Sequence, residues 1–356
     1  MNKIYKVIGL MSGTSLDGLD IAYCTFELTD GNRWIYKILN AETIKYEDIW
    51  IKRLSSAENS SAYDISLLNV EYGEFLGLQT KNFIKKYNLK PDFISSHGHT
   101  IVHQPSKGLT LQIGSGSTIA AAANCDVIND FRVMDVALGG QGAPLVPIGD
   151  RFLFAEYDCC INLGGFANIS FEKENHRIAF DICPVNIVLN YLTQQLGLAY
   201  DDGGRFAREG NLNEELFNQL QQLSYYQQNF PKSLGKEWVL THIIPILNDF
   251  NISINDKLRT FAEHISSQII NAINSNQSNK VLLTGGGTYN TFLINCLKKN
   301  SNHNYIIPER EIIDFKEALI FAFLGVLRLR GEINCLKSVT GAKKDSCGGS
   351  FHKIFG

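Results

Sequence analysis

The stretch Ile8-Gly9-Leu10-Met11-Ser12-Gly13-Thr14-Ser15-Leu16-Asp17-Gly18-Leu19-Asp20 decides the fold. Apolar runs on both sides flank a turn of glycines and hydroxyl residues, which is the pattern of a β-hairpin. We expect Gly13 and Gly18 to take positive φ and to let the backbone approach a ligand closely. Turn amides can bind an anion, and the hydroxyl donors beside them are Ser12, Thr14 and Ser15. A polar turn that binds nothing is the alternative.

Asp17 is the unusual member of this turn. A carboxylate repels phosphate unless a cation stands between them, and a divalent metal beside a polyphosphate removes that conflict. The turn therefore predicts a nucleotide polyphosphate with Mg²⁺, which Asp17 would orient through its water shell.

Length and composition favour a two-domain globular protein. The chain has 356 residues, of which 44% are hydrophobic and 19% charged, and this length exceeds that of most single cores. Its 33 basic and 36 acidic residues give a net charge of -3 without a basic run, which argues against a nucleic-acid partner. We see no signal peptide and no bilayer-length apolar segment, so we expect a cytoplasmic protein without a membrane partner. The eight scattered cysteines predict free thiols.

A second glycine-turn hairpin follows in the middle of the chain. Residues 159–163 and 167–171 read as two strands around Gly164 and Gly165. Two such hairpins, one in each half, predict duplicated α/β domains with mixed sheets that grip a phosphate chain. Expected helices cover residues 62–87, 114–124, 185–196, 257–274 and 315–325.

Residues 9–18 look like the N-terminal signature of the anhydro-N-acetylmuramic acid kinases. This family is grouped with sugar and acetate kinases, actin and heat-shock chaperone ATPases. The resemblance continues to the C-terminus. It implies an α/β, two-domain actin-like ATPase (ribonuclease H-like) fold with a deep interdomain cleft. We assign 1–129 plus 340–356 to domain I and 130–339 to domain II, with hinges near Asp130 and Val339.

The resemblance also implies an ATP site built from three glycine-rich segments. The two hairpins would be the phosphate-1 and phosphate-2 motifs, and residues 285–290 the adenosine motif, where a strand, three glycines and a helix start suit backbone contact with a nucleotide. The expected ATP and phosphate ligands are Ser12, Gly13, Thr14, Ser15, Asp17, Gly18, Gly164, Gly165, Asn168, Gly285, Gly286 and Gly287.

A long polar loop at 130–144 is the expected sugar side. In the related kinases this segment contacts the muramyl sugar, and Arg, Asp and Gln suit its hydroxyls and amides; a structural loop held by its own salt bridge is the alternative. The expected sugar contacts are His97, Arg132, Asp135, Gln141, Lys232 and Glu317. Lys232 could instead be a solvated surface lysine. His97 and His99 could also hold a metal, although Gly98 suggests a bend and His99 stands where the family usually has Gln.

Asp181 is the expected catalytic base. It ends a predicted strand before a helix, a position that serves either a catalytic role or an ordinary helix N-terminus. The family motif is Asp-Thr-Gly-Pro-Gly-Asn, whereas the segment here departs from it at Ile182, Cys183 and Val185. These departures could narrow the sugar pocket beside Asp181 or exclude water from it.

The resemblance implies ATP- and Mg²⁺-dependent conversion of 1,6-anhydro-N-acetylmuramic acid to N-acetylmuramic acid 6-phosphate in peptidoglycan recycling, and a possible homodimer. Two alternatives are a kinase of the same fold for another sugar and a non-catalytic ATP-binding sensor.

Overall fold

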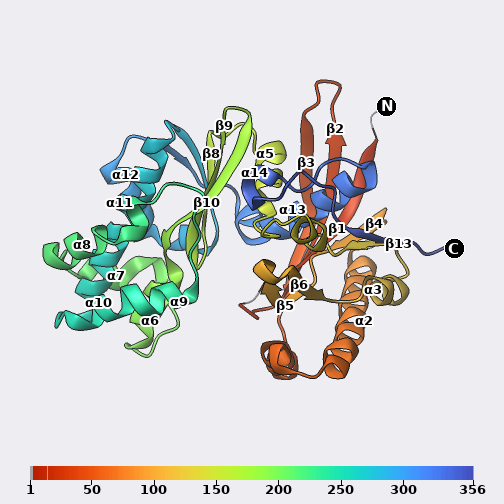
Figure 1. Ribbon diagram of the computed structural model, residues 1–356, viewed down its shortest axis with the longest axis horizontal. Coiled ribbons are helices and arrows are strands. Elements are labelled where there is room, and N and C mark those ends of the chain that lie inside the picture. Colours follow the sequence, from red (N-terminus) through yellow and green to blue (C-terminus); the bar gives the residue numbers. More distant parts are fainter. Residues whose placement is uncertain (1–2, 14, 356) are drawn as a thin grey trace. The chain divides into compact units, whose positions relative to one another are not determined.

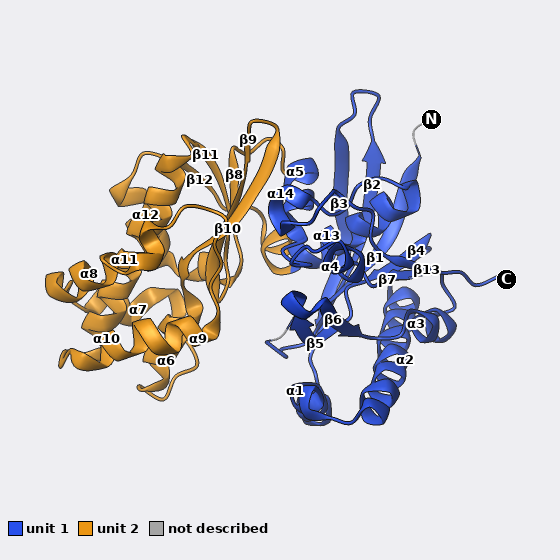
Figure 2. Ribbon diagram, viewed as in Figure 1, with its two compact units in different colours: residues 1–153, 315–356 blue, residues 154–314 orange. Residues whose placement is uncertain are grey.

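The computed structural model describes residues 3–13 and 15–355 and divides the chain into two compact units. Unit 1 comprises residues 1–153 and 315–356, and unit 2 comprises residues 154–314 (Figure 1, Figure 2).

The main sheet of unit 1 has the strand order β13-β7-β4-β1-β2-β3. β1, β2 and β3 form an antiparallel meander, β4 and β7 continue the sheet parallel to β1, and β13 pairs antiparallel with β7. A small second sheet pairs β5 with β6. The strands are β1 (Ile4–Ser12), β2 (Leu19–Leu28), β3 (Trp34–Ile44), β4 (Phe93–Ser96), β5 (His99–Gln104), β6 (Leu109–Ile113), β7 (Val127–Asn129) and β13 (Ser350–His352).

The longest helix of the chain's first third, α2 (Ala62–Tyr87), has the bounds that the sequence predicts. Ser61 caps its N-terminus by accepting a hydrogen bond from the Asp64 amide, and Asn88 ends it in the left-handed conformation. A Cβ at Gly73 or Gly77 would meet atoms of Ser115 or Ala122 at 2.9 and 2.6 Å, so both glycines allow close packing against α3 (Gly116–Ala123).

Two helical layers cover the unit 1 sheet because side chains alternate along β1. Ile8 and Leu10 lie in a core shared with α2. On the opposite face of β1, Gly9 packs closely against the backbone of α13 (Arg310–Arg330). The residues of α13 from Phe315 on belong to unit 1. Ser95 Oγ donates to the Phe321 carbonyl oxygen at 2.5 Å. The remaining helices are α1 (Asp48–Ser56), η1 (Ala57–Asn59), η2 (Pro105–Lys107), α4 (Val133–Ala137), α5 (Val146–Leu153) and α14 (Lys337–Thr340).

The sheet of unit 2 has the order β10-β9-β8-β11-β12. Its strands are β8 (Cys159–Leu163), β9 (Phe166–Lys173), β10 (His176–Pro184), β11 (Lys280–Thr284) and β12 (Asn304–Ile306). Helix α11 (Ile254–Ser275) supplies much of the core. The other helices are α6 (Asn186–Gln194), η3 (Asp202–Gly204), α7 (Arg205–Glu209), α8 (Glu214–Gln221), η4 (Ser224–Gln227), α9 (Lys236–Trp238), η5 (Val239–Ile243), α10 (Ile244–Asp249), η6 (Gly286–Tyr289) and α12 (Thr291–Asn300).

The two units repeat one topology. β3-β2-β1-β4-β7 in unit 1 and β10-β9-β8-β11-β12 in unit 2 have the same order, with an antiparallel meander followed by two parallel strands. The prediction of duplicated α/β domains of the actin-like, ribonuclease H-like type is therefore confirmed.

The unit boundaries differ from the predicted domain boundaries. The sequence interpretation divided the chain at 129/130 and 339/340, whereas the structure places residues 130–153 and 315–339 in unit 1. The reason is packing: α13 covers the unit 1 sheet, and a Cβ at Gly149 of α5 would meet the side chain of Ile320 on α13 at 2.5 Å.

None of the eight cysteines, all of which lie in the described part of the chain, forms a disulfide, as expected. Within the described residues, no helix is both long and apolar enough to cross a membrane.

Candidate functional site

The unit 1 turn joins β1 to β2 at the carboxyl end of β1. The Leu16 amide donates to the Gly13 carbonyl at 3.3 Å, and Ser15 Oγ donates to Asp17 Oδ1 at 2.8 Å. The expected positive φ at Gly13 and Gly18 is wrong, because Leu16 takes it instead, with φ 59°. Gly18 is required for space: a Cβ there would lie 2.6 Å from the Ile44 carbonyl oxygen. Thr14, an expected phosphate ligand, lies outside the described residues.

Ser12 is buried in a hydrogen-bonded network beneath this turn. Its Oγ accepts from the Tyr46 hydroxyl at 2.7 Å and lies 2.9 Å from His99 Nδ1, and the Tyr46 and Tyr72 hydroxyls are 2.6 Å apart. Ser12 is only 2% exposed. The expected phosphate contact of the Ser12 hydroxyl does not fit this environment, because the group already has two partners within the protein.

His97 and Arg132 form a coupled pair beside the end of β4. Arg132 Nε and Nη2 lie 3.0 and 2.9 Å from His97 Nε2, and Nη1 donates to the Gly142 carbonyl at 2.6 Å. An imidazole nitrogen that faces a guanidinium must accept, so we assign the proton to Nδ1, which lies 3.0 Å from the Gly98 carbonyl. Desolvation, reinforced by the Arg132 charge, holds the pKa of His97 well below its usual range. Gly98 has φ 74°, so the expected bend is present.

Asp135 supports the 130–144 loop from within. Its Oδ2 accepts from the Gly142 amide at 2.8 Å, and its Oδ1 accepts from Thr340 Oγ1 at 2.7 Å and Cys335 Sγ at 3.1 Å. The side chain is 1% exposed. The predicted sugar contact of Asp135 does not fit, since both oxygens are occupied. The Gln141 side chain is exposed, whereas the backbone N–H of Gln141 donates to the Thr340 carbonyl at 2.8 Å.

Glu317 lies on α13 within the electrostatic reach of Arg132 and Asp17. Desolvation raises the pKa of the Glu317 carboxyl, the positive charges of Arg132 and Lys316 lower it, and Asp17 raises it. Desolvation also lowers the pKa of Arg132 to about 10, and Glu317 opposes that shift. Glu317 thus lies within electrostatic range of two other predicted residues of unit 1, Arg132 and Asp17. The sequence interpretation missed the buried ion pair beside them, in which Lys316 Nζ lies 2.8 Å from Asp150 Oδ1.

The unit 2 turn is held by backbone contacts to the start of α6. The Gly165 carbonyl accepts from the Val185 and Ile187 amides at 2.8 and 3.3 Å, and the Gly164 carbonyl accepts from the Asn186 amide at 3.3 Å. A Cβ added at Gly165 would have open space for 4 Å around it. The turn is therefore firmly anchored on one side and accessible on the other.

Polar residues form a row across the unit 2 sheet next to this turn. Thr284 of β11 pairs with Asn162 of β8, which pairs with Asn168 of β9, which in turn pairs with Asp181 of β10. Directly paired residues share a face of a sheet, so these side chains project together. Asn168 and Asp181 were predicted site residues. Asn162 was not, and its only sequence signal is its position immediately before the glycine turn.

Asp181 is a half-buried carboxylate with one oxygen committed. Oδ2 accepts from the Leu234 amide at 2.9 Å, and the Asp181 carbonyl accepts from the Tyr225 hydroxyl at 2.6 Å. Among the described residues of unit 2, none donates a hydrogen bond to Oδ1. Desolvation raises the pKa of Asp181, and the Leu234 amide opposes this shift. An oriented carboxylate with an available oxygen and a raised pKa suits a general base.

The departures after Asp181 face the protein interior. Ile182, Cys183 and Val185 belong to the hydrophobic core of unit 2, with exposures of 3%, 0% and 0%. At the position of the second motif glycine, Val185 has φ -128° and ψ -98°, which lies outside the usual helical and extended regions. Their effect on a substrate pocket beside Asp181 stays a prediction.

Lys232 holds the segment that covers Asp181. Its Nζ donates to the Tyr225 carbonyl at 3.2 Å and lies 4.7 Å from the centre of the Tyr225 ring. The Asp181 amide donates to the Lys232 carbonyl at 3.3 Å. Desolvation lowers the pKa of the half-buried Lys232. These contacts argue against the alternative interpretation, in which Lys232 is a solvated surface lysine.

The 285–287 glycines lie against the end of β8. Gly285 has φ 83°, and a Cβ there would meet Asn162 Oδ1 at 2.4 Å, whereas Gly286 faces open space. Gly287 packs against Leu163. These glycines therefore adjoin the polar row and leave backbone accessible at Gly286.

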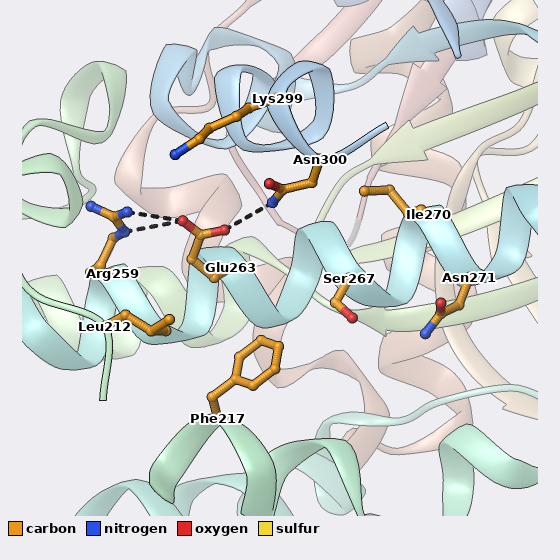
Figure 3. Close-up of a pocket in the computed structure, with 9 residues that line it drawn as sticks. All are labelled: Leu212, Phe217, Arg259, Glu263, Ser267, Ile270, Asn271, Lys299 and Asn300. Carbon is orange, nitrogen blue, oxygen red and sulfur yellow. Dashed lines mark hydrogen bonds and ion pairs between the residues drawn. The ribbon is translucent and has the colours of Figure 1, made fainter. Parts of the chain in front are cut away.

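Two further features bear on the candidate site residues: groups of side chains that could bind a metal, and an open pocket on the helical face of unit 2. Within the described part of the chain, neither lies at the candidate site. Among residues 3–13 and 15–355, no group of three His, Cys, Asp or Glu side chains could hold a metal ion. The pocket has a volume of about 460 Å³ and lies along α11, where Glu263 binds Arg259 and Asn300 (Figure 3).

Comparisons with known proteins agree over nearly the whole chain. The family model described as anhydro-N-acetylmuramic acid kinase matches residues 5–353. Proteins named anhydro-N-acetylmuramic acid kinase are similar in Francisella tularensis subsp. novicida (33% identity, 96% of this chain and 97% of that one) and Coxiella burnetii (34%, 98% and 97%). The protein of that name from Clostridioides difficile is 34% identical over 94% of this chain and 95% of its own.

Proposed function

Because the chain belongs to the anhydro-N-acetylmuramic acid kinase family, we propose that it opens 1,6-anhydro-N-acetylmuramic acid with water and phosphorylates it from ATP. The product is N-acetylmuramic acid 6-phosphate. The resemblance seen in the sequence is confirmed by the family match. Peptidoglycan recycling, a cytoplasmic location and a homodimer are further proposals that rest on the family relationship.

The observation that carries the proposal is the position of Asp181. It lies in register with Asn168, next to the accessible Gly164–Gly165 turn, and one of its oxygens is held by the Leu234 amide. Asp181 takes a proton from water as the water attacks the anomeric carbon. The bond from that carbon to the bridging oxygen breaks, and this oxygen attacks the γ-phosphorus, releasing ADP. The carboxyl then returns its proton to solvent.

Other residues bind and orient the substrates. The Gly165 and Gly286 backbones, with the unit 1 turn, are the proposed phosphate contacts. Arg132, held by His97 and Gly142, and Glu317 are the proposed sugar contacts, with Gln141 exposed beside them. Rigid donors of this kind align the reacting groups and cost little reorganisation.

A single exposed carboxylate, Asp17, fits Mg²⁺ that keeps most of its water shell. Ser15 Oγ donates a hydrogen bond to Asp17 Oδ1 and so orients the carboxylate. The carboxylate oxygens of Asp17 are hard ligands that suit a hydrated cation. Mg²⁺, when bound, neutralises charge on the transferred phosphoryl group.

The two alternatives lose their main support. A changed substrate or a non-catalytic sensor was suggested by Ile182, Cys183 and Val185, and these side chains pack in the hydrophobic core of unit 2.

The test is a coupled assay of ADP release with Mg-ATP and the anhydro sugar, with the product identified by mass spectrometry. In H₂¹⁸O, hydrolytic opening puts the label on the anomeric hydroxyl. ADP release only with another sugar would assign a different substrate. Nucleotide binding without ADP release from any sugar in a panel would overturn the kinase proposal.

A further inference from the structure

Four buried side chains beneath the unit 1 turn form one continuous hydrogen-bonded chain. It runs from Tyr72 to Tyr46, then to Ser12, and ends at His99, with distances of 2.6, 2.7 and 2.9 Å. None of the four is more than 7% exposed. They come from α2, the segment after β3, the end of β1 and the start of β5, so the chain ties four separate elements together.

The direction of these hydrogen bonds follows from the hydrogens available. The Tyr46 hydroxyl donates its one hydrogen to Ser12, so it must accept from Tyr72. Burial lowers the pKa of His99 to about 4, so its ring is neutral at pH 7 and one nitrogen can accept. We assign that acceptor to Nδ1 and the donor to the Ser12 hydroxyl. The hydrogen of Ser12 is then unavailable to a phosphate.

The described residues of the turn above Ser12, 13 and 15–18, make few hydrogen bonds with one another. Within it, the described contacts are one 3.3 Å backbone bond from Leu16 to Gly13 and the exposed bond from Ser15 to Asp17. Ser12 is the last residue of β1, directly before the turn. Displacement of Ser12 would therefore displace the amides of the described turn residues with it.

We propose that Tyr46, Tyr72 and His99 are positioning residues for the phosphate-binding turn, and that Ser12 acts through them instead of contacting phosphate. This inference rests on the proposed function, since it assumes that the turn binds the phosphates of ATP. According to this inference, these three side chains affect nucleotide binding although they contact no substrate.

A double-mutant cycle between Ser12→Ala and Tyr46→Phe tests the inference. The readout is the affinity for a non-hydrolysable ATP analogue, measured by calorimetry without sugar. We expect each variant to weaken binding by about tenfold and the double variant to be no weaker than Ser12→Ala, because both break the same chain. In turnover, KM for ATP should rise while KM for the sugar stays unchanged.

Direct phosphate contact by Ser12 gives a different result. Ser12→Ala alone would then weaken binding, Tyr46→Phe would leave it unchanged, and the inference would be overturned. Tyr23→Phe is the matched control, because Tyr23 donates to the Lys90 carbonyl in the same unit and lies outside the network. It should change thermal stability only.

Variants at His99 add a rescue experiment. His99→Gln keeps an acceptor for the Ser12 hydroxyl and should bind nucleotide within about twofold of the parent, whereas His99→Leu should lose about tenfold. Equal affinities in these two variants would contradict the role of His99. A parent that binds the analogue but turns over no sugar would overturn only the proposed substrate. A parent that binds no nucleotide would overturn the proposed function and this inference with it.

Discussion

The two glycine turns occupy the same place in two copies of one topology, yet they are supported differently. The unit 1 turn rests on side chains, through Ser12 and its tyrosine and histidine partners. The unit 2 turn rests on backbone, through amides at the start of α6 that donate to Gly164 and Gly165. Equivalent strand positions therefore do not imply equivalent sensitivity to substitution.

The units also differ in the residue that faces the turn from the third strand. In unit 2, Asp181 pairs with Asn168 and keeps one oxygen available to a ligand. In unit 1, Thr43 of β3 pairs with Asp20 of β2, and Thr43 Oγ1 donates to Asp20 Oδ1 at 2.5 Å. Of these two positions on the third strand, only the one in unit 2 carries a carboxylate.

The largest expected effect is at Asp181, the proposed base. Asp181→Asn keeps the size of the side chain and removes proton acceptance, so turnover should fall by about 10² to 10⁴-fold while ATP-analogue affinity stays unchanged. Asp20→Asn in unit 1 is the control and should keep the parent turnover. An Asp181→Asn variant that works at the parent rate would remove Asp181 as the base.

Gly165→Val tests whether the accessible side of the unit 2 turn is a phosphate site. The new side chain enters space where a Cβ meets no protein atom within 4 Å, so folding should be preserved and ATP-analogue affinity should fall about tenfold or more. Calorimetry and thermal melting measure the two quantities. Gly31→Val, in the exposed loop between β2 and β3, should alter neither. Unchanged affinity in a folded Gly165→Val protein would remove this turn from the nucleotide site.

Asp135→Asn tests the dependence of unit 1 on buried side chains. Both carboxylate oxygens of Asp135 accept hydrogen bonds from Gly142, Thr340 and Cys335, whereas the side chain of Asn has only one accepting oxygen. In the variant, the NH₂ group therefore faces a donor. The free energy of unfolding should fall by about 2 to 3 kcal/mol. Denaturant titration measures it. Asp158→Asn is the unit 2 counterpart, where exposed amides of Asn279 and Lys280 can turn to water, and it should cost less. Equal costs would contradict the proposed difference between the units.

Each unit also holds a buried neutral histidine. Burial lowers the pKa of His99 to about 4 and that of His264 to about 3. An unfolded histidine titrates near about 6.5, so below that pH the unfolded state binds more protons and stability falls. His99→Gln should remove up to about 3 kcal/mol of the loss between pH 6.5 and 4. The exposed His176→Gln is the control, and parallel pH profiles for His99→Gln and the parent would contradict the assignment.

Local sequence patterns were sufficient for much of the architecture. The hairpins, the α2 helix with its Ser61 cap, and the strand that delivers Asp181 depend on residue order and on neighbouring backbone hydrogen bonds. Glycine turns after apolar strands were visible for the same reason. The boundary between the units was not, because it depends on which sheet α13 covers.

The sequence by itself determined the duplicated α/β plan, the family and the candidate base, since these depend on periodicity and on a long contiguous motif. Tertiary structure alone decided what each polar side chain does. Ser12 meets a partner 87 positions away at His99, and Asp135 meets one 205 positions away at Thr340. Whether a buried hydroxyl or carboxylate binds a ligand or supports a loop depends on which donors surround it, and packing brings those donors from distant parts of the chain.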